Sequence, residues 1–267
     1  MSEPSTTAGG TTFEPIRITW EATPFAARLR LGLVALATDH TSETELHRML
    51  PADGVDLFVT RVHYSGYCDP ASLRAMGDEL AAAAELLLPG TPLDGIAWGC
   101  TSGTAALGFE RVASTIRAAR PGVTVTTPLS AAGAAFRTLG VGRVAVLTPY
   151  SDEVNRMIVE RLEEGGIRVP RLATFDLRTD REMWTVPPEA IEAAVADMEV
   201  AGAEAVFVSC TALRSALAIA PLERRIGLPV ITSNQAMLWE MLRSAGYAHP
   251  IQGFGRLLAD PIAAVPA

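Results

Sequence analysis

The sequence is poor in cysteine, in long apolar runs and in clustered basic charge, and each shortage excludes a class of protein. Three cysteines in 267 residues are an odd and sparse set, which argues against a disulfide framework and predicts reduced thiols in a cytoplasmic protein. No segment reaches the roughly 18 unbroken apolar residues that a membrane-spanning helix needs. The polar start has no apolar signal core, so no secretion signal is expected.

Motifs for nucleic acids, metals and nucleotides are also missing from the sequence. The formal net charge is -8 and no basic run occurs, so we expect neither nucleic acid nor an anionic membrane surface as a partner. There is no HExxH or CxxC spacing for a metal, and neither GxGxxG nor a P-loop for a nucleotide. An acidic protein can still bind a small anion, because the local potential of a site is separate from net charge.

Short apolar runs alternate with longer helical patterns through most of the chain. Such runs are typical of strands that are buried on both faces of a parallel sheet. The predicted helices include 152–164, which is followed by two glycines, and 234–245. The alternation predicts an α/β protein with parallel sheets flanked by helices. The strand candidates are 29–37, 54–62, 95–98, 142–150, 203–210 and 228–233.

The two halves of the chain repeat the same order of elements at nearly the same spacing. Asp39, after the first strand candidate, precedes Cys100 by 61 positions (100 − 39), and Thr148 precedes Cys210 by 62 (210 − 148). Similarity at this spacing predicts two related lobes rather than a solenoid, whose period would be about 20 to 50 residues.

The expected domain boundaries follow from this repeat and from composition. Residues 1–26 are rich in Ser, Thr, Gly and Pro and are expected to form a flexible tail. We expect the first lobe over 27–125, completed by 232–267, and the second lobe over 126–231.

Cys100 and Cys210 lie in the same local pattern, an apolar strand followed by a small residue, Cys and Thr. The two stretches are IAWGCTSGT and VFVSCTALRS. Ligands of open parallel sheets bind at the carboxyl ends of strands, and a helix N-terminus there favours thiolate over thiol. The amide groups that follow each cysteine are natural donors to a substrate carboxylate. They belong to Thr101, Ser102, Thr211 and Ala212.

Two such cysteines, one from each lobe, suit chemistry on opposite faces of one carbon or one double bond. If the lobes are related by a pseudo-twofold axis, the two sulfurs face each other across one cleft. One sulfur can then add to the substrate or take a proton on one face, while the other acts on the opposite face. A single cysteine would be weaker evidence, because buried cysteine is common in strands.

The motifs GLVALATDHTSETE, WGCTSGT, VAVLTPYSDEVN and VSCTALRS resemble those of the aspartate/glutamate racemase superfamily. The resemblance runs from about residue 28 to 256 and is greatest to the maleate cis–trans isomerase and ectoine-utilisation branch, with arylmalonate decarboxylase as another relative. It implies two Rossmann-like lobes related by a pseudo-twofold axis, no cofactor, and catalysis by Cys100 and Cys210. It also implies that Tyr150 contacts the substrate.

Two positions depart from the pattern of maleate isomerase. The asparagine that holds a substrate carboxylate in that family corresponds to Asp39 here, and a second substrate asparagine aligns with Asp180. An ionised aspartate would repel a carboxylate, so either Asp39 is protonated or it meets a cationic or hydroxyl group. This favours an amino or hydroxylated dicarboxylate over maleate. Arylmalonate decarboxylase keeps only the second-lobe cysteine, so the presence of Cys100 favours isomerisation or racemisation over decarboxylation.

Three further features have ordinary structural interpretations. Cys68, in HYSGYCDP, is expected to be a plain loop thiol. His40 is expected to be a polar loop or first-turn residue, with a proton relay near the cleft as the alternative. Ser42 and Glu45 have the spacing of a capping box, so Thr41 or Ser42 is expected to cap a helix, with substrate contact as the alternative.

Three hypotheses about function follow. The first is a cofactor-independent isomerase or racemase of a small, C4-type carboxylic or amino dicarboxylic acid, with Cys100 as nucleophile or base and Cys210 as the opposing acid. The second is a cofactor-free decarboxylase of a malonate-like acid on the same scaffold. The third is a non-catalytic carboxylate-binding protein. A homodimer is expected as the commonest closed assembly.

Overall fold

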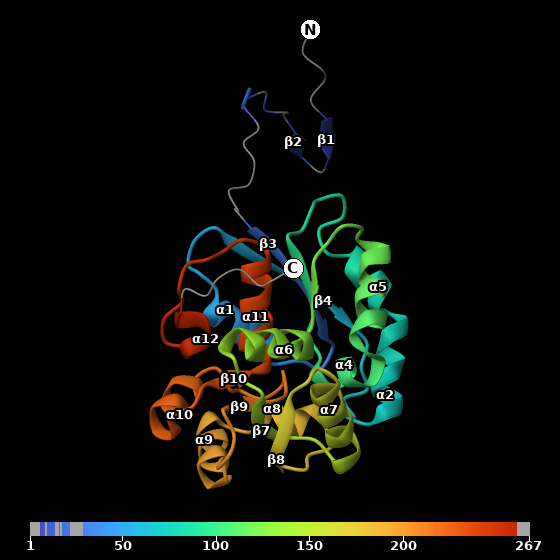
Figure 1. Ribbon diagram of the computed structural model, residues 1–267. Coiled ribbons are helices and arrows are strands. Elements are labelled where there is room, and N and C mark those ends of the chain that lie inside the picture. Colours follow the sequence, from blue (N-terminus) through green and yellow to red (C-terminus); the bar gives the residue numbers. More distant parts are fainter. Residues whose placement is uncertain (1–5, 9, 14–15, 17, 22–28, 261–267) are drawn as a thin grey trace.

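Two four-stranded parallel sheets form the centre of the molecule, and helices pack against both (Figure 1). The computed structural model describes residues 6–8, 10–13, 16, 18–21 and 29–260. The predicted α/β class with two lobes is confirmed. The first sheet contains β3 (Leu29–Leu36), β4 (Val55–Val62), β5 (Gly95–Trp98) and β6 (Val125–Thr126). The second contains β7 (Arg143–Thr148), β8 (Arg168–Thr174), β9 (Ala205–Val208) and β10 (Val230–Thr232).

The two sheets have the same topology. Their strand orders are β4-β3-β5-β6 and β10-β9-β7-β8, so in each sheet the first strand of the lobe lies between the second and the third. In open parallel sheets with this order, the ligand binds where the strand order reverses, beside the carboxyl ends of the first and third strands. The topology therefore directs attention to the ends of β3 and β5 in one lobe, and of β7 and β9 in the other.

Helices connect successive strands, as parallel pairing requires. Those up to the end of the first sheet are α1 (Ser42–Met49), α2 (Pro70–Ala75), the 3₁₀ turn η1 (Met76–Asp78), α3 (Leu80–Glu85), α4 (Thr101–Leu107) and α5 (Phe109–Ala119). Those that follow are α6 (Pro128–Leu139), α7 (Asp152–Glu164), α8 (Asp180–Thr185), α9 (Pro188–Asp197), α10 (Ile219–Ile226), α11 (Ser233–Ser244) and α12 (Arg256–Ala259).

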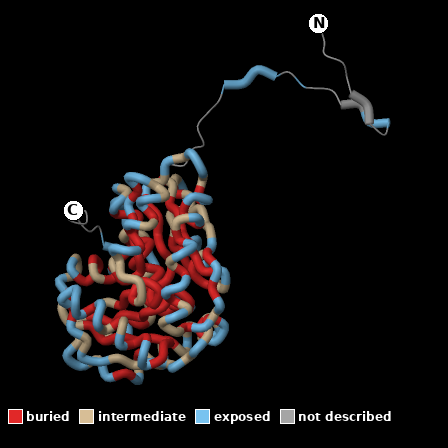
Figure 2. The backbone as a smooth tube through the Cα atoms, turned by 90° about the vertical axis from the view of Figure 1, so that its right-hand side faces the viewer, coloured by how far each residue is buried: buried red, intermediate tan, exposed pale blue. Residues whose placement is uncertain are grey.

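Burial explains why the central strands read as continuous apolar runs. Every residue of β5 and β9 is buried, whereas β8, at a sheet edge, is largely exposed or half-buried. Figure 2 shows the buried backbone concentrated inside the molecule, with exposed segments around it. The strands that lead to the two cysteines thus lie in the best-packed part of the structure, and rigid elements hold functional side chains most accurately.

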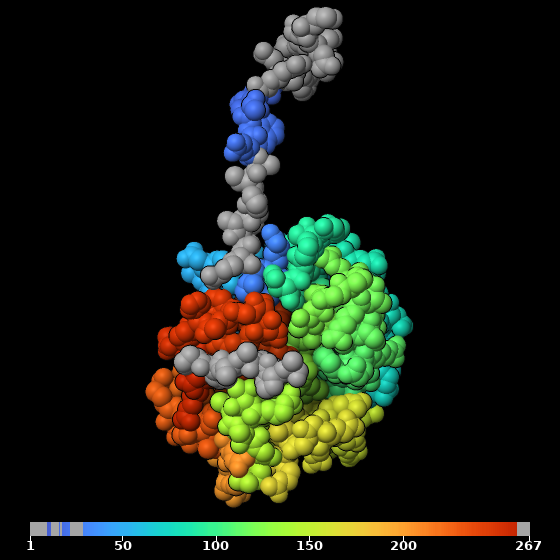
Figure 3. Space-filling view, turned by 45° about the horizontal axis from the view of Figure 1, so that its top comes forward, coloured from blue at the N-terminus to red at the C-terminus, as the bar shows by residue number. Residues whose placement is uncertain are grey.

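Helix α11 packs next to α6 and also contacts α1, β5 and β6. Figure 3 shows the orange-red C-terminal helices beside the green α6 on one face of the molecule. The contacts with α1, β5 and β6 are with the first lobe, whereas α6 lies in the segment assigned to the second, so the completion of the first lobe by the chain after residue 232 stays a prediction. Residues 261–267 of that segment lie outside the described residues.

The predicted flexible tail, 1–26, lies partly outside the described residues, and its flexibility stays a prediction. The described part includes a small antiparallel hairpin of β1 (Thr6–Ala8) and β2 (Thr11–Phe13). Across the part of the chain that the structure describes, none of the helices has the length and apolar character needed to cross a membrane.

Candidate functional site

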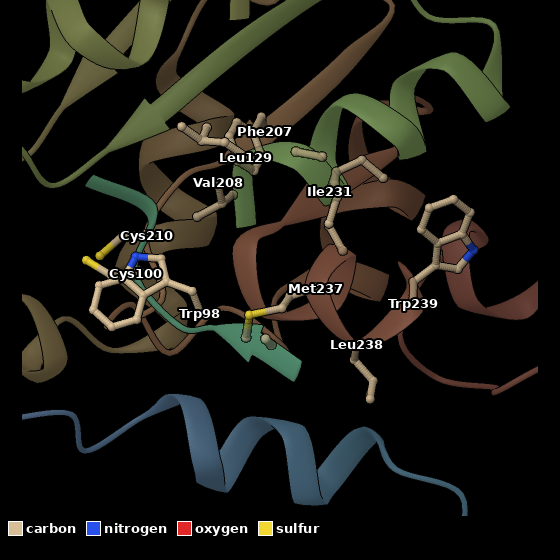
Figure 4. Packing of buried hydrophobic residues seen from close by; sticks show 14 of the residues in the cluster. Trp98, Cys100, Leu129, Phe207, Val208, Cys210, Ile231, Met237, Leu238 and Trp239 are labelled. Atoms are coloured by element: carbon tan, nitrogen blue, oxygen red, sulfur yellow. The ribbon is translucent and has the colours of Figure 1, made fainter. Parts of the chain in front are cut away.

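Cys100 and Cys210 line the same cavity, at the carboxyl ends of β5 and β9. Figure 4 shows their two sulfur atoms close together beside Trp98. The space available in this closed state is roughly 10 Å³, enough for about one water molecule, so a C4 acid can enter only if the walls move. The residues around the cavity are Leu36, Asp39, Tyr64, Cys100, Ser102, Tyr150, Asp180, Met183, Cys210, Thr211 and Ala212.

The two cysteines occupy equivalent positions in the two lobes. In each lobe, the residue after the strand that leads to the cysteine makes one more backbone hydrogen bond to the neighbouring strand, and the chain then turns. The Gly99 N–H donates to the Val34 carbonyl at 2.9 Å in the first lobe, and the Ser209 N–H donates to the Leu147 carbonyl at 2.8 Å in the second. In both lobes the cysteine is the next residue. The repeat in the sequence therefore corresponds to a repeat in space, and the two sulfurs approach the cavity from different lobes.

Cys100 is the N-cap residue of α4, and its sulfur takes the place of the usual capping oxygen. The Gly103 N–H donates to the Sγ atom at 3.1 Å, and the Ser102 Oγ lies 3.7 Å from it. Position 103 has no free room for a side chain, because a Cβ atom there would lie 2.9 Å from the sulfur, closer than unstrained contacts allow. Burial raises the pKa of the Cys100 thiol to about 12, while the Gly103 and Ser102 hydrogen bonds act in the opposite direction.

Cys210 lies in a tight turn, and its sulfur is held by different donors. The Ala212 N–H donates to the Sγ atom at 3.3 Å, and the Tyr150 hydroxyl is hydrogen-bonded to the same sulfur. Burial raises the pKa of Cys210 to about 12, opposed by the Tyr150 hydrogen bond. The backbone carbonyl of Tyr150 accepts hydrogen bonds from Asn155 and Thr174, which fix the turn after β7 that brings the ring into the cavity.

Asp39 follows β3 and has two differently placed carboxylate oxygens. Its Oδ1 accepts from the Thr41 and Ser42 N–H groups at 2.7 and 2.9 Å. Its Oδ2 is buried and has no hydrogen-bond partner in the described part of the chain. One oxygen thus holds the start of α1, and the other is a buried, unpartnered oxygen of a residue that lines the cavity.

The expected capping role of Thr41 or Ser42 was wrong. Thr41 precedes α1 without a side-chain capping bond, and its hydroxyl donates to the Ala212 carbonyl at 2.8 Å. The Ser42 hydroxyl donates to the Thr211 carbonyl at 3.4 Å. Both hydroxyls therefore bind the loop after Cys210 in the other lobe, and Asp39 supplies the cap instead.

Asp180 is the first residue of α8 and contacts the first lobe. Its Oδ2 accepts a hydrogen bond from the Thr38 hydroxyl at 2.5 Å. Burial raises the pKa of Asp180 to about 6, and the nearby Asp39 adds to the increase, whereas Thr38 and His40 lower it. The structure thus places both aspartates predicted to contact substrate on the wall of one cavity.

The hydroxyls of two predicted substrate-binding residues are bound elsewhere. The Thr211 hydroxyl donates to the Gly99 carbonyl at 3.1 Å, although Thr211 lines the cavity. The Thr101 hydroxyl is directed away from the cavity. It donates to the Ser233 Oγ at 2.9 Å, and Thr101 is not among the residues around the cavity. Helix α11 packs against this end of β5, so its serine captures the hydroxyl. Any role of Thr101 in binding is therefore limited to its backbone N–H, at the first turn of α4, where amides lack intrahelical partners.

Cys68 and Tyr64 belong to the site, although the sequence did not identify them. Cys68 was expected to be an ordinary loop thiol, but it is 7% exposed and its Sγ lies 3.7 Å from the Ser102 Oγ. Its N–H donates to the Arg178 carbonyl across the lobes. Tyr64 lines the cavity directly. Their place in the chain could have identified them, because both residues lie in the loop after β4, at the same end of the sheet as Cys100.

A wider, open pocket of about 580 Å³ lies next to the reactive cavity and shares Asp180 with it. His40 lies there, exposed and stacked on Trp184 with ring centroids 4.6 Å apart. Arg181 also lines this pocket. His40 thus has the expected polar loop position, and Arg181 gives this pocket a positively charged side chain.

Among the described residues, no group of three or more His, Cys, Asp or Glu side chains could hold a metal ion. The residues around the cavity supply thiols, carboxyls, hydroxyls and backbone amides. Such a set can bind a small acid, transfer a proton or add a thiolate to an electrophilic carbon.

Comparison with known proteins places these features in a family. The chain is 26% identical to a maleate isomerase from Nocardia farcinica over 86% of this chain and 95% of the relative. A solved structure of a mutant maleate isomerase from Pseudomonas putida S16 with maleate superposes with a TM-score of 0.80 at 21% identity, covering 86% of this chain and 97% of the other. A cysteine-to-serine mutant of the Nocardia farcinica enzyme, with a covalently bound succinylcysteine intermediate, gives 0.79 at 23% identity over 86% and 98%.

The family model described as arylmalonate decarboxylase matches residues 103–258. This range contains Cys210 and Tyr150 and begins just after Cys100. Because the match covers more than half of the sequence, the chain belongs to the arylmalonate decarboxylase family.

Proposed function

We propose that this protein is a cofactor-independent isomerase or racemase of a small, C4-type carboxylic acid, which acts through Cys100 and Cys210 in the manner of maleate isomerase. The observation that carries the proposal is the convergence of these two thiols on one closed cavity from equivalent positions in two lobes. The similarity to maleate isomerases supports it, as does the succinylcysteine intermediate of one of them.

The difference between the two thiols assigns their roles. Cys100 caps α4, so the helix dipole and the Gly103 N–H favour its thiolate. As a nucleophile, the thiolate forms a C–S bond to one alkene carbon while the π electrons move to the neighbouring carbon and its carboxylate. Rotation about the resulting single bond and expulsion of the thiolate give the other isomer. Cys210, hydrogen-bonded to Tyr150, acts as the proton donor and acceptor on the opposite face.

The free backbone amides at the start of α4 stabilise the negative charge that develops on the substrate carboxylate, whereas the Ala212 N–H already donates to the Cys210 sulfur. Helix α4 begins at Thr101, and its first N–H groups have no intrahelical acceptor. Ser102 adds a hydroxyl that lines the cavity. Donors placed where charge grows in the transition state are typically worth about 2.7 to 4 kcal/mol each.

The test is proton NMR in D2O of the full chain with maleate, D- and L-aspartate, hydroxyaspartate, diaminobutyrate and arylmalonates. We expect isomerisation or α-proton exchange with at least one acid, and a loss of at least about a thousandfold in Cys100→Ser and Cys210→Ser. Circular dichroism should show an unchanged fold in both variants. Full turnover in either variant would contradict the roles assigned to the thiols.

Decarboxylation of a malonate-type acid is the second candidate, because the matching family model is that of arylmalonate decarboxylase. That reaction needs a single proton donor, which Cys210 would supply. If Cys100→Gly retains CO2 release from an arylmalonate while Cys210→Gly abolishes it, this alternative replaces the isomerase.

We also propose a cytoplasmic location, because Cys68, Cys100 and Cys210 are all free thiols and reactive thiols persist in reducing compartments. The homodimer stays a prediction, as does the role in ectoine utilisation that the sequence resemblance implies.

A further inference from the structure

The charged groups around the reactive cavity are of one sign. Asp39 and Asp180 both line it, and no arginine or histidine is among its described lining residues. Asp39 Oδ2 is buried and lacks a hydrogen-bond partner within the described residues. Buried carboxylates are costly unless they are paired, so an unpaired carboxylate oxygen on a residue that lines a cavity is a position where a ligand is expected to supply the partner.

The two aspartates are close enough to act together. Their carboxyl groups interact, since Asp39 contributes to the raised pKa of Asp180. Thr38 donates to Asp180, and His40, one residue beyond Asp39, faces the outer pocket and not the inner cavity. His40 lowers the pKa of Asp180 from the outer pocket, but no cationic side chain is among the described residues that line the inner cavity beside the two aspartates.

The side of the cavity formed by Cys100 and the start of α4 instead favours a negatively charged group. Ser102 offers a hydroxyl, and the first turn of α4 offers unpaired N–H groups, both suited to a carboxylate. The cavity thus has hydrogen-bond donors at the start of α4 and hydrogen-bond acceptors at Asp39 and Asp180. A ligand that matches both sides has a carboxylate and a hydrogen-bond donor of positive charge.

We propose that the substrate is a small amino carboxylic acid, whose ammonium group is bound by Asp39 and Asp180, and that the site discriminates against plain dicarboxylates such as maleate. This proposal rests on the two-cysteine function proposed above and specifies its substrate class. A second carboxylate in place of the ammonium group would face two acidic side chains in a desolvated space, where like charges repel strongly.

Binding of an ammonium group also assists the chemistry. Asp180 disfavours ionisation of both catalytic thiols, and a cation placed against it offsets that effect and favours the thiolate. The thiolate of one cysteine then removes the α-proton, leaving its electron pair on the α-carbon and carboxylate. The thiol of the other cysteine returns a proton to the opposite face. The products are the inverted amino acid and the same two thiols with their ionisation exchanged, so protons and charge balance.

Asp39→Asn and Asp180→Asn test the proposal with nearly unchanged shape. An asparagine at 39 can keep the Oδ1 acceptor that holds Thr41 and Ser42 while replacing Oδ2 with a donor. Asp176→Asn is the matched control, because Asp176 is exposed, pairs with Arg178 and lies outside the cavity. Its positive φ of 52° is also one that asparagine tolerates well.

The measurement compares kcat/KM by NMR in D2O, and Kd by calorimetry, for aspartate and diaminobutyrate enantiomers against maleate. Wild type should prefer the amino acids. Each cavity substitution should weaken their use about 10- to 100-fold, as expected for loss of a charged hydrogen bond, and should improve binding or isomerisation of maleate. Asp176→Asn should behave as wild type.

Failure of this proposal is distinguishable from failure of the two-cysteine function. If wild type isomerises maleate in preference to every amino acid and still depends on both cysteines, the substrate class is wrong and the function stands. If no acid turns over, calorimetry still decides the class, because tighter binding of maleate than of the amino acids to wild type overturns it. Preference for amino acids that persists in both cavity variants overturns it as well.

Discussion

The two cysteine loops start from equivalent strand ends but continue differently. After Cys100 the chain enters α4 at once, and the sulfur caps that helix. After Cys210 the chain makes a turn, and the next helix, α10, begins only at Ile219. The first sulfur therefore has a helix N-terminus and the second a tyrosine hydroxyl. With the roles proposed above, this difference lets one repeated position supply a nucleophile in one lobe and an acid in the other.

Among the substitutions that test this difference, Gly103→Ala is expected to have the largest effect on activity. It changes the surroundings of the Cys100 sulfur at the start of α4 and leaves those of Cys210 unchanged. The added methyl group would lie 2.9 Å from the Cys100 sulfur and 3.1 Å from Met76. Displacing a reacting atom by about 1 Å can cost about a hundredfold in rate, and overpacking destabilises by about 1 to 3 kcal/mol. Steady-state kinetics and thermal unfolding measure the two effects.

Gly133→Ala is the control for this substitution. It lies inside α6, where a Cβ atom would meet only the end of the Arg137 side chain at 3.5 Å, so helix propensity should make the protein slightly more stable. Equal losses of activity in the two variants would show that the contact with the sulfur is not the cause.

Tyr150→Phe tests the second loop. It removes the hydrogen bond to the Cys210 sulfur and should raise the pKa of that thiol further, because the bond favours the thiolate. We expect a reduction in kcat of about 10- to 100-fold, with a smaller change in the reactivity of Cys100. The alkylation rate of each thiol can be measured as a function of pH by peptide mass spectrometry, which separates the effect on Cys210 from the effect on Cys100. An equal change at both thiols would contradict separate environments.

Asp180→Asn should stabilise the protein near neutral pH. The folded-state pKa is raised from 3.8 to about 6, so the carboxylate destabilises the fold above pH 6, and this penalty disappears as the pH falls from 6 to below 4. The shift corresponds to roughly 2 to 3 kcal/mol. Denaturant unfolding at pH 7.5 and pH 4 should therefore show a gain for the variant at the higher pH alone. A gain of the same size at both values would point to another cause.

Cys68→Ala is expected to have the smallest effect. It removes the contact with the Ser102 hydroxyl, which also approaches Cys100, but Cys68 is not among the lining residues. The loss of one neutral hydrogen bond should change kcat by less than about tenfold. A loss as large as that of Cys100→Ser would place Cys68 among the catalytic groups.

Local patterns in the sequence were sufficient to predict six of the eight strands of the two described parallel sheets, the two lobes and the convergence of Cys100 and Cys210 at the strand ends. The short β6 and the largely exposed edge strand β8 were missed, because neither is a long, continuous apolar run. The predicted features depend on residues close together in the chain. Contacts between lobes could not be read in this way. Cys68 enters the site because its loop pairs with the segment before α8, through the Tyr67–Thr179 bridge and the Arg178 carbonyl.

Contacts between distant parts of the chain also explain why the roles of some side chains differ from those predicted. Thr101 was expected to face the substrate, but Ser233, 132 residues later in the chain, accepts its hydroxyl. Ser42 was expected to cap α1, but it reaches the Thr211 carbonyl of the other lobe. In each case a partner distant in sequence offers an acceptor that the local pattern does not contain.

Arsenite binding tests most directly whether Cys100 and Cys210 face one another. The experiment uses the full chain carrying Cys68→Ala, in which each bound As(OH)3 would form two As–S bonds to the remaining thiols and release two water molecules. Intact-protein mass spectrometry should find one arsenic per chain, and none when Cys100→Ser or Cys210→Ser is added. Arsenic retained after either added substitution, or both thiols remaining separately alkylatable in excess arsenite, would contradict a shared cavity.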